Sequence, residues 1–159
     1  MCTTRRRTPG EVESEQVDFS KTLVGHPDNV SEDSVRFRES EIDTAMHLRA
    51  AGLVWGPEPG HYVFDINGIV RAGSPFQAGI FLIHSANTFE ILAGGQDEMF
   101  ENFVWLPTWE DCRTWLTEKQ VADDRVNSAW QSGRAQGLTD REVLYGLILE
   151  VLERSAAAE

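Results

Sequence analysis

The stretch His61-Tyr62-Val63-Phe64-Asp65-Ile66 decides the fold, because its side chains alternate in character along an extended run. Successive side chains of a β-strand point to opposite faces. The alternation therefore predicts a strand with one face carrying Tyr62, Phe64 and Ile66, and the other His61, Val63 and Asp65. Asn67-Gly68 follows and is a strong signal for a tight turn, so residues 69–71 are predicted to pair back on this strand.

Three other short apolar runs are typical of strands. Residues 53–55 stop at Gly56-Pro57, and residues 103–106 stop at Pro107. Residues 79–83 are apolar throughout and predict a central strand covered on both faces. The runs together predict a small sheet of four to five strands. It is mainly antiparallel, and a mixed sheet stays open because strand–helix–strand order recurs between residues 79 and 106.

Two of these runs resemble each other. Leu53-Val54-Trp55-Gly56-Pro57 and Phe103-Val104-Trp105-Leu106-Pro107 share a hydrophobic-Val-Trp-x-Pro pattern. Two copies fall short of the three or more repeats that a solenoid needs. We interpret the echo as chance similarity between two strand ends.

Helix starts are marked by Ser or Thr followed three residues later by an acid. In this arrangement the hydroxyl and the carboxylate accept hydrogen bonds from amides that the first helical turn leaves unpaired. The pattern occurs at Ser40, Thr108 and Thr139. Together with apolar spacing, it predicts an α+β domain in which helices pack on one side of the sheet, at about 41–51, 108–119, 124–134 and 139–154.

The N-terminal part differs from the rest. Residues 1–34 contain only scattered apolar side chains and show no helical or strand periodicity. Such a segment cannot bury enough apolar surface to offset its chain entropy. A flexible, disordered tail is therefore predicted over residues 1–34, ahead of a single domain over 35–159.

Charge is the compositional outlier. The net charge is -12, and residues 41–159, with eight basic and eighteen acidic side chains, hold -10 of it. Direct nucleic-acid binding is not expected, because it requires a basic surface. Plain solubility, docking of a basic protein and imitation of a nucleic-acid backbone remain open, and solubility is the most economical of the three.

Location follows by elimination. Cys2 and Cys112 do not have the spacing of a disulfide framework or zinc site, and two free thiols indicate a reducing compartment. Arg5-Arg6-Arg7 is followed by polar residues and not by the apolar region of a signal peptide. No apolar run reaches membrane-spanning length. A cytoplasmic protein without membrane association is expected.

Motifs for catalysis, metals and phosphate are missing from the sequence, so no cofactor and no metal are expected. The best catalytic candidates are His61, Asp65 and His84. His61 and Asp65 share a strand face but lie about 13 Å apart at strand rise, too far to share a small metal unaided. His84 could approach either residue and act as a general base. A structural role is commoner for such a pair, so a small enzyme or ligand-binding domain ranks second.

The favoured hypothesis is a non-catalytic protein-binding or regulatory protein with a basic partner. Trp109 is the first residue after a helix cap and precedes two acids, whereas Trp55, Trp105, Trp115 and Trp130 are predicted to be core. An exposed Trp ringed by polar groups has the composition of an interface hot spot. The predicted partner-binding residues are Trp109, Glu110, Asp111, Asp97, Glu98 and Glu101.

Overall fold

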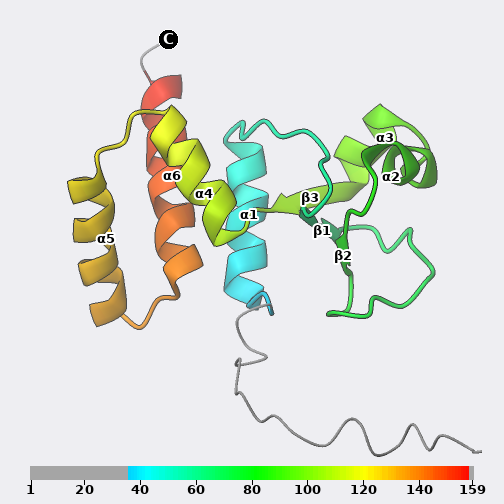
Figure 1. Ribbon diagram of the computed structural model, residues 1–159, viewed down its shortest axis with the longest axis horizontal. Helices are drawn as coiled ribbons and strands as arrows, with labels where there is room; N and C mark the ends of the chain where they lie inside the picture. The colour runs from blue at the N-terminus through cyan, green and yellow to red at the C-terminus, as the bar shows by residue number, and fades with distance from the viewer. Residues whose placement is uncertain (1–35, 158–159) are drawn as a thin grey trace, which may run out of the picture. The chain divides into compact units, whose positions relative to one another are not determined.

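The computed structural model describes residues 36–157, so the predicted tail over 1–34 and its boundary at 35 lie outside the described residues. The prediction of an α+β architecture is confirmed (Figure 1). No helix in the described range is long and apolar enough to cross a bilayer. The elements are α1 (Glu39–Ala50), β1 (Tyr62–Asp65), β2 (Ile80–Leu82), α2 (Ala86–Ala93), α3 (Gln96–Asn102), β3 (Phe103–Leu106), α4 (Trp109–Glu118), α5 (Asp123–Ala135) and α6 (Asp140–Ala156).

The sheet of the described chain has three antiparallel strands in the order β2-β1-β3. Val63 in β1 lies opposite Phe81 in β2 and Trp105 in β3. The strand predicted at 61–66 therefore occupies the centre. The run at 79–83 was predicted as central, which is wrong: β2 lies at an edge, because β3 pairs with the free side of β1 instead.

The predicted hairpin partner at 69–71 does not form. The carboxylate of Asp65 accepts hydrogen bonds from the backbone N–H of Ile69 (3.1 Å) and of Val70 (2.8 Å). Amides bound to a side chain are not available to a strand ladder. Asn67-Gly68 does turn the chain, with Gly68 at φ +63°, but the turn leads into a loop.

Residues 53–55 also remain outside the sheet, so the predicted count of four to five strands is wrong. The backbone N–H of Leu53 donates to Leu48 O at 2.9 Å, which closes the end of α1 around Gly52 at φ +91°. Val54 is 86% exposed. The backbone of this segment completes the end of α1, and it pairs with none of the three strands of the described sheet.

The described residues form six helices, against about four predicted. A helix between the strands at 79–83 and 103–106 was expected but given no bounds, and that segment contains two helices, α2 and α3. The hydroxyl of Ser85 caps α2 by accepting from the N–H of Thr88. Gly94 and Gly95, both at positive φ, separate α2 from α3. α3 is only seven residues long and buries Met99 alone, so it lacks a periodic apolar face that sequence could reveal.

The capping predictions are confirmed at Thr108 and Thr139, which form capping boxes with Asp111 and Glu142. The prediction at Ser40 is wrong. α1 begins two residues earlier than predicted, after Arg38, whose N–H donates to Glu41 Oε2 at 2.8 Å. The hydroxyl of Ser40 donates instead to Glu142 Oε1 at 2.6 Å.

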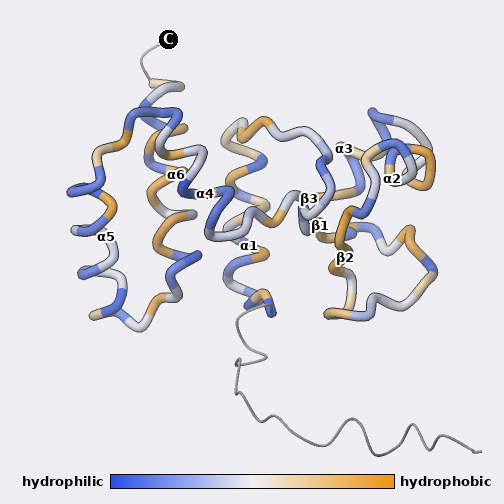
Figure 2. Tube along the Cα trace, viewed as in Figure 1, coloured by the Kyte–Doolittle hydropathy of each residue, from blue (hydrophilic) through white to orange (hydrophobic). Residues whose placement is uncertain are grey.

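Apolar side chains gather on both faces of the sheet, and Figure 2 shows their alternation with polar residues along the chain. Ile80, Val104 and Leu106 join the cluster formed with α1, α4, α5 and α6. On the other face, Val63 and Phe103 pack with Ala93 of α2 and Met99 of α3, and Ile83 joins them. Helices therefore cover both faces, which corrects the prediction of helices on one side.

Candidate functional site: a tryptophan-lined hollow

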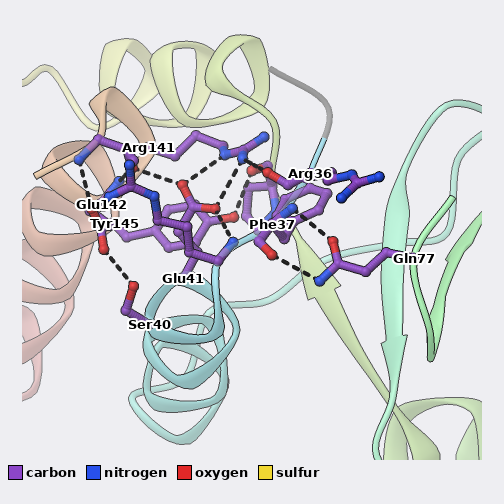
Figure 3. Close-up of polar contacts among 11 residues, drawn as sticks. Arg36, Phe37, Ser40, Glu41, Gln77, Arg141, Glu142 and Tyr145 are labelled. Carbon is purple, nitrogen blue, oxygen red and sulfur yellow. Dashed lines mark hydrogen bonds and ion pairs between the residues drawn. The ribbon is translucent and has the colours of Figure 1, made fainter. Parts of the chain in front are cut away.

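Two polar arrangements stand out, and the first is buried. Glu41 has no exposed surface, yet it accepts hydrogen bonds from Arg141 Nε (3.0 Å), Thr139 Oγ1 (2.7 Å) and the N–H of Arg38 (2.8 Å) (Figure 3). The guanidinium of Arg141 also lies 4.2 Å from the centroid of the Phe37 ring. We call this set the Glu41–Arg141 network.

The Glu41–Arg141 network holds together segments that are far apart in sequence. Arg141 lies in the first turn of α6 and donates to the backbone carbonyl of Arg36. Gln77 exchanges two hydrogen bonds with the backbone of Phe37, at 3.0 and 2.9 Å. Because each of these charged and amide groups has partners, the network stabilises the start of α1 and offers no open binding position.

The groups beside the network have shifted pKa values. Burial alone would raise the pKa of Glu142, but hydrogen bonds from Ser40 and Thr139 outweigh it and lower the pKa below its usual value. Burial raises the pKa of the Cys112 thiol and of the Tyr145 phenol. Cys112 is free and fully buried, and the Tyr145 hydroxyl donates to Pro107 O at 2.7 Å. Neither group is positioned as a nucleophile.

The second arrangement is a hollow of about 330 Å³, here called the tryptophan hollow. It is built from the loop between α1 and β1, the start of β1, β3, and one face of α4. On α4, positions 111, 114, 115 and 118 share that face, while Cys112 and Leu116 turn into the core. The lining residues are Val54, Trp55, Gly56, Glu58, His61, Trp105, Asp111, Thr114, Trp115 and Glu118.

The walls of the hollow are aromatic. The rings of Trp55 and Trp105 stack at 6.1 Å with 16° between their planes. The His61 ring lies 5.0 Å from Trp105, because the two residues are diagonal neighbours across the β1–β3 pairing. Phe100 of α3 meets Trp55 edge-on at 5.7 Å. The stacked faces of Trp55 and Trp105 cover each other, and Lys119 Nζ lies 5.6 Å from the centroid of the Trp115 ring, so an occupant has the remaining faces and edges of these half-buried rings.

The charge of the hollow is negative. Its lining, all within residues 36–157, contains three carboxylates (Glu58, Asp111 and Glu118) and no Lys or Arg. Asp111 Oδ2 accepts from the N–H and the hydroxyl of Thr108, at 2.8 and 2.9 Å. Asp111 Oδ1 faces His61 Nε2 at 3.9 Å, longer than a hydrogen bond. One oxygen of Asp111 therefore holds the helix cap while the other remains available.

Two buried polar atoms in the walls have no hydrogen-bond partner in the described chain. They are His61 Nδ1 and Trp105 Nε1. Buried polar atoms without partners are rare and are costly to a folded protein. A third such atom, Trp130 Nε1, lies outside the lining of the hollow, so unpaired polar atoms add to the description of the hollow without identifying it as the site.

The predicted catalytic residues are not joined to one another by any hydrogen bond or ion pair of the described chain. Asp65 is 5% exposed and holds the loop after β1. His84 is exposed beyond β2. His61 faces Asp111, a residue that was predicted for partner binding. The structure therefore places His61, a predicted catalytic residue, beside Asp111, a predicted partner-binding residue.

The predicted partner-binding residues are distributed over two helices. Trp109 is 40% exposed, but its ring stacks on Trp130 at 6.1 Å with 6° between the planes, away from the lining of the hollow. Glu110 is exposed beside it. The remaining predicted acids, Asp97, Glu98 and Glu101, are exposed on α3.

Sequence reasoning missed the place of five aromatic or acidic lining residues. Trp55, Trp105 and Trp115 were predicted to be core but are half-buried in the walls, and Glu58 and Glu118 were not among the predicted site residues. A signal for one of the walls did exist: the echo between 53–57 and 103–107 aligns Trp55 with Trp105, the two rings that stack.

A further hollow, of about 530 Å³, is lined in part by Lys119, Arg125 and Arg154. Glu150 lies 2.6 Å from Arg125 and 3.6 Å from Arg154, so its one carboxylate compensates only one of the two guanidinium charges. Among the described residues, no three His, Cys, Asp or Glu side chains are placed to hold a metal ion. Comparisons with models of protein families, with curated proteins and with solved structures found no match.

Proposed function

We propose that this protein is a non-catalytic binding protein that recognises a basic partner protein through the tryptophan hollow. A single observation carries the proposal. Three half-buried indoles and three carboxylates line one open hollow, and no Lys or Arg of the lining neutralises them. The acidic residues that the sequence singled out contribute Asp111 directly.

The physical basis is that a cation bound in the tryptophan hollow is stabilised by two kinds of group, the indole rings and the carboxylates. Indole faces attract positive charge through the ring quadrupole, most strongly where water is partly excluded. Carboxylates at the same position add charge-assisted hydrogen bonds. The remaining charge of the chain, including exposed acids on α3, raises the rate at which a basic partner arrives.

The proposal is tested by titrating the full chain with a synthetic peptide of about 20 residues that alternates Lys and Arg with Gly and Ser, at about 50 and about 300 mM salt. We expect affinity to fall steeply with salt. Trp55→Ala removes a wall and should weaken binding at least about fivefold, whereas Trp109→Ala, an indole deletion outside the hollow, should change it less than about twofold. Binding that is lost in Trp109→Ala and kept in Trp55→Ala would return the site to Trp109. No binding at low salt would overturn the proposal.

A second candidate is an enzyme that uses His61 as a general base, since Asp111 stands beside the imidazole in the same hollow. Binding ranks first for two reasons. The Nε2–Oδ1 separation of 3.9 Å is not a hydrogen bond, and the lining contains no Ser or Cys. General-base catalysis needs a proton within hydrogen-bond reach of a fixed imidazole.

A further inference from the structure

We infer that the occupant of the tryptophan hollow is the side chain of an arginine presented by the partner protein. This inference rests on the proposed function and names its ligand. The argument uses the volume of the hollow, its open acceptors, and a copy of the same arrangement inside this protein.

The volume admits one long side chain. At about 330 Å³, the hollow lies at the lower end of ordinary ligand pockets. Its walls are ring faces and edges from the α1–β1 loop, β3 and α4, which suit a flat group. A guanidinium is planar and stacks on aromatic faces, whereas an ammonium is compact and strongly hydrated.

The acceptors favour a group rich in donors. The side-chain carboxylates of Glu58 and Glu118 make no hydrogen bond or ion pair within the described chain, and Asp111 has one oxygen outside its helix cap. A guanidinium carries five N–H donors in a fixed fork that matches carboxylates. A trimethylated ammonium keeps its charge but has no N–H, so it would donate no hydrogen bond to the three carboxylates.

The protein itself contains the completed arrangement. In the Glu41–Arg141 network a guanidinium lies over the Phe37 ring at 4.2 Å and bonds to a carboxylate at 2.9 and 3.0 Å. The tryptophan hollow supplies the ring and the carboxylate but no guanidinium of its own. An arginine from outside would complete it in the same way.

The experiment uses the full chain and peptides of about nine neutral residues with one central Arg, Lys, trimethyllysine or citrulline, followed by NMR of the five tryptophan indole N–H signals. We expect the Arg peptide to bind at least about tenfold more tightly than the citrulline peptide and about threefold more tightly than the Lys peptide. Signals of Trp55, Trp105 and Trp115 should shift, while those of Trp109 and Trp130 serve as internal controls.

Matched acids separate local from general charge effects. Glu118→Gln, in the lining, should weaken the Arg peptide about threefold or more, whereas Glu110→Gln, on the same helix but outside the hollow, should leave its affinity within about 1.5-fold. Equal binding of Arg and citrulline, tightest binding of trimethyllysine, or shifts confined to Trp109 and Trp130 would each overturn the inference. If only the long basic peptide binds, the inference is also overturned, but the proposed function is supported. If neither the long basic peptide nor the single-Arg peptide binds, both the proposed function and this inference are wrong.

Discussion

The Glu41–Arg141 network and the tryptophan hollow use the same ingredients in opposite ways. Each places a carboxylate from the first turn of a helix, Glu41 in α1 and Asp111 in α4, close to an aromatic ring. In the network a guanidinium lies between ring and carboxylate, and the carboxylate has no exposed surface. In the hollow that place is open and two polar atoms of the walls lack partners.

The difference shows how one interaction type serves two purposes. Where the chain supplies its own cation, the arrangement closes and binds together α1, α6 and the residues before α1. The lining of the hollow supplies no cation, although Lys119 Nζ lies 5.6 Å from the centroid of the Trp115 ring, and under our proposal a partner supplies it. Stability should therefore depend on the network and recognition on the hollow, and three substitutions test that division.

The largest effect is expected from Arg141→Ala. The substitution leaves Glu41 buried without its cation, and breaking a buried pair in this way costs about 3–5 kcal/mol. The measurement is the free energy of unfolding in urea. As a control, Glu41→Leu with Arg141→Met removes both charges and should destabilise less than the single change. If the double variant is the less stable, the charge pair is not the source of the effect.

A smaller effect is expected from Glu142→Gln, and it depends on pH. The folded-state pKa of Glu142 is lowered, so its contribution is present above the unfolded value of about 4.5 and is lost as the pH falls through the folded value. Glu142→Gln should cost about 1 kcal/mol at pH 7 and flatten the loss of stability as the pH falls below about 4.5. Unfolding at a series of pH values measures it, with the exposed Glu153→Gln as control. If the stability falls at acid pH in the same way in Glu142→Gln as in the unaltered protein, the hydrogen bonds from Ser40 and Thr139 do not stabilise an ionised Glu142.

The smallest effect on stability is expected from Glu118→Gln. Glu118 is exposed and shares the hollow with two other carboxylates, so the substitution should change the free energy of unfolding by less than about 0.5 kcal/mol. Urea unfolding of this variant, compared with its peptide affinity, measures whether the two properties separate. A loss of more than 1 kcal/mol, taken as about twice the surface range, would mean that the hollow is structural like the network.

The elements that local rules govern were predictable. Thr108 with Asp111 and Thr139 with Glu142 mark helix starts because the hydroxyl and the carboxylate act on amides of their own turn. The alternation over 61–66 identified β1 because strand geometry alone assigns its two faces. The predictions were wrong where a group distant in sequence binds the side chain that carries the local signal. Ser40 fits a cap, but its hydroxyl bonds to Glu142, 102 residues away.

Sequence by itself determined the α+β class, the strand within 61–66, the helix starts at Thr108 and Thr139, and the acidity. Tertiary structure alone decided that Trp55, Trp105 and Trp115 share a hollow with Asp111, and that Glu41 meets Arg141 across 100 residues. The physical reason is the distance along the chain over which each interaction acts. Capping and alternation act within a few residues, whereas a site is formed by loops and helices whose meeting depends on how the whole core packs.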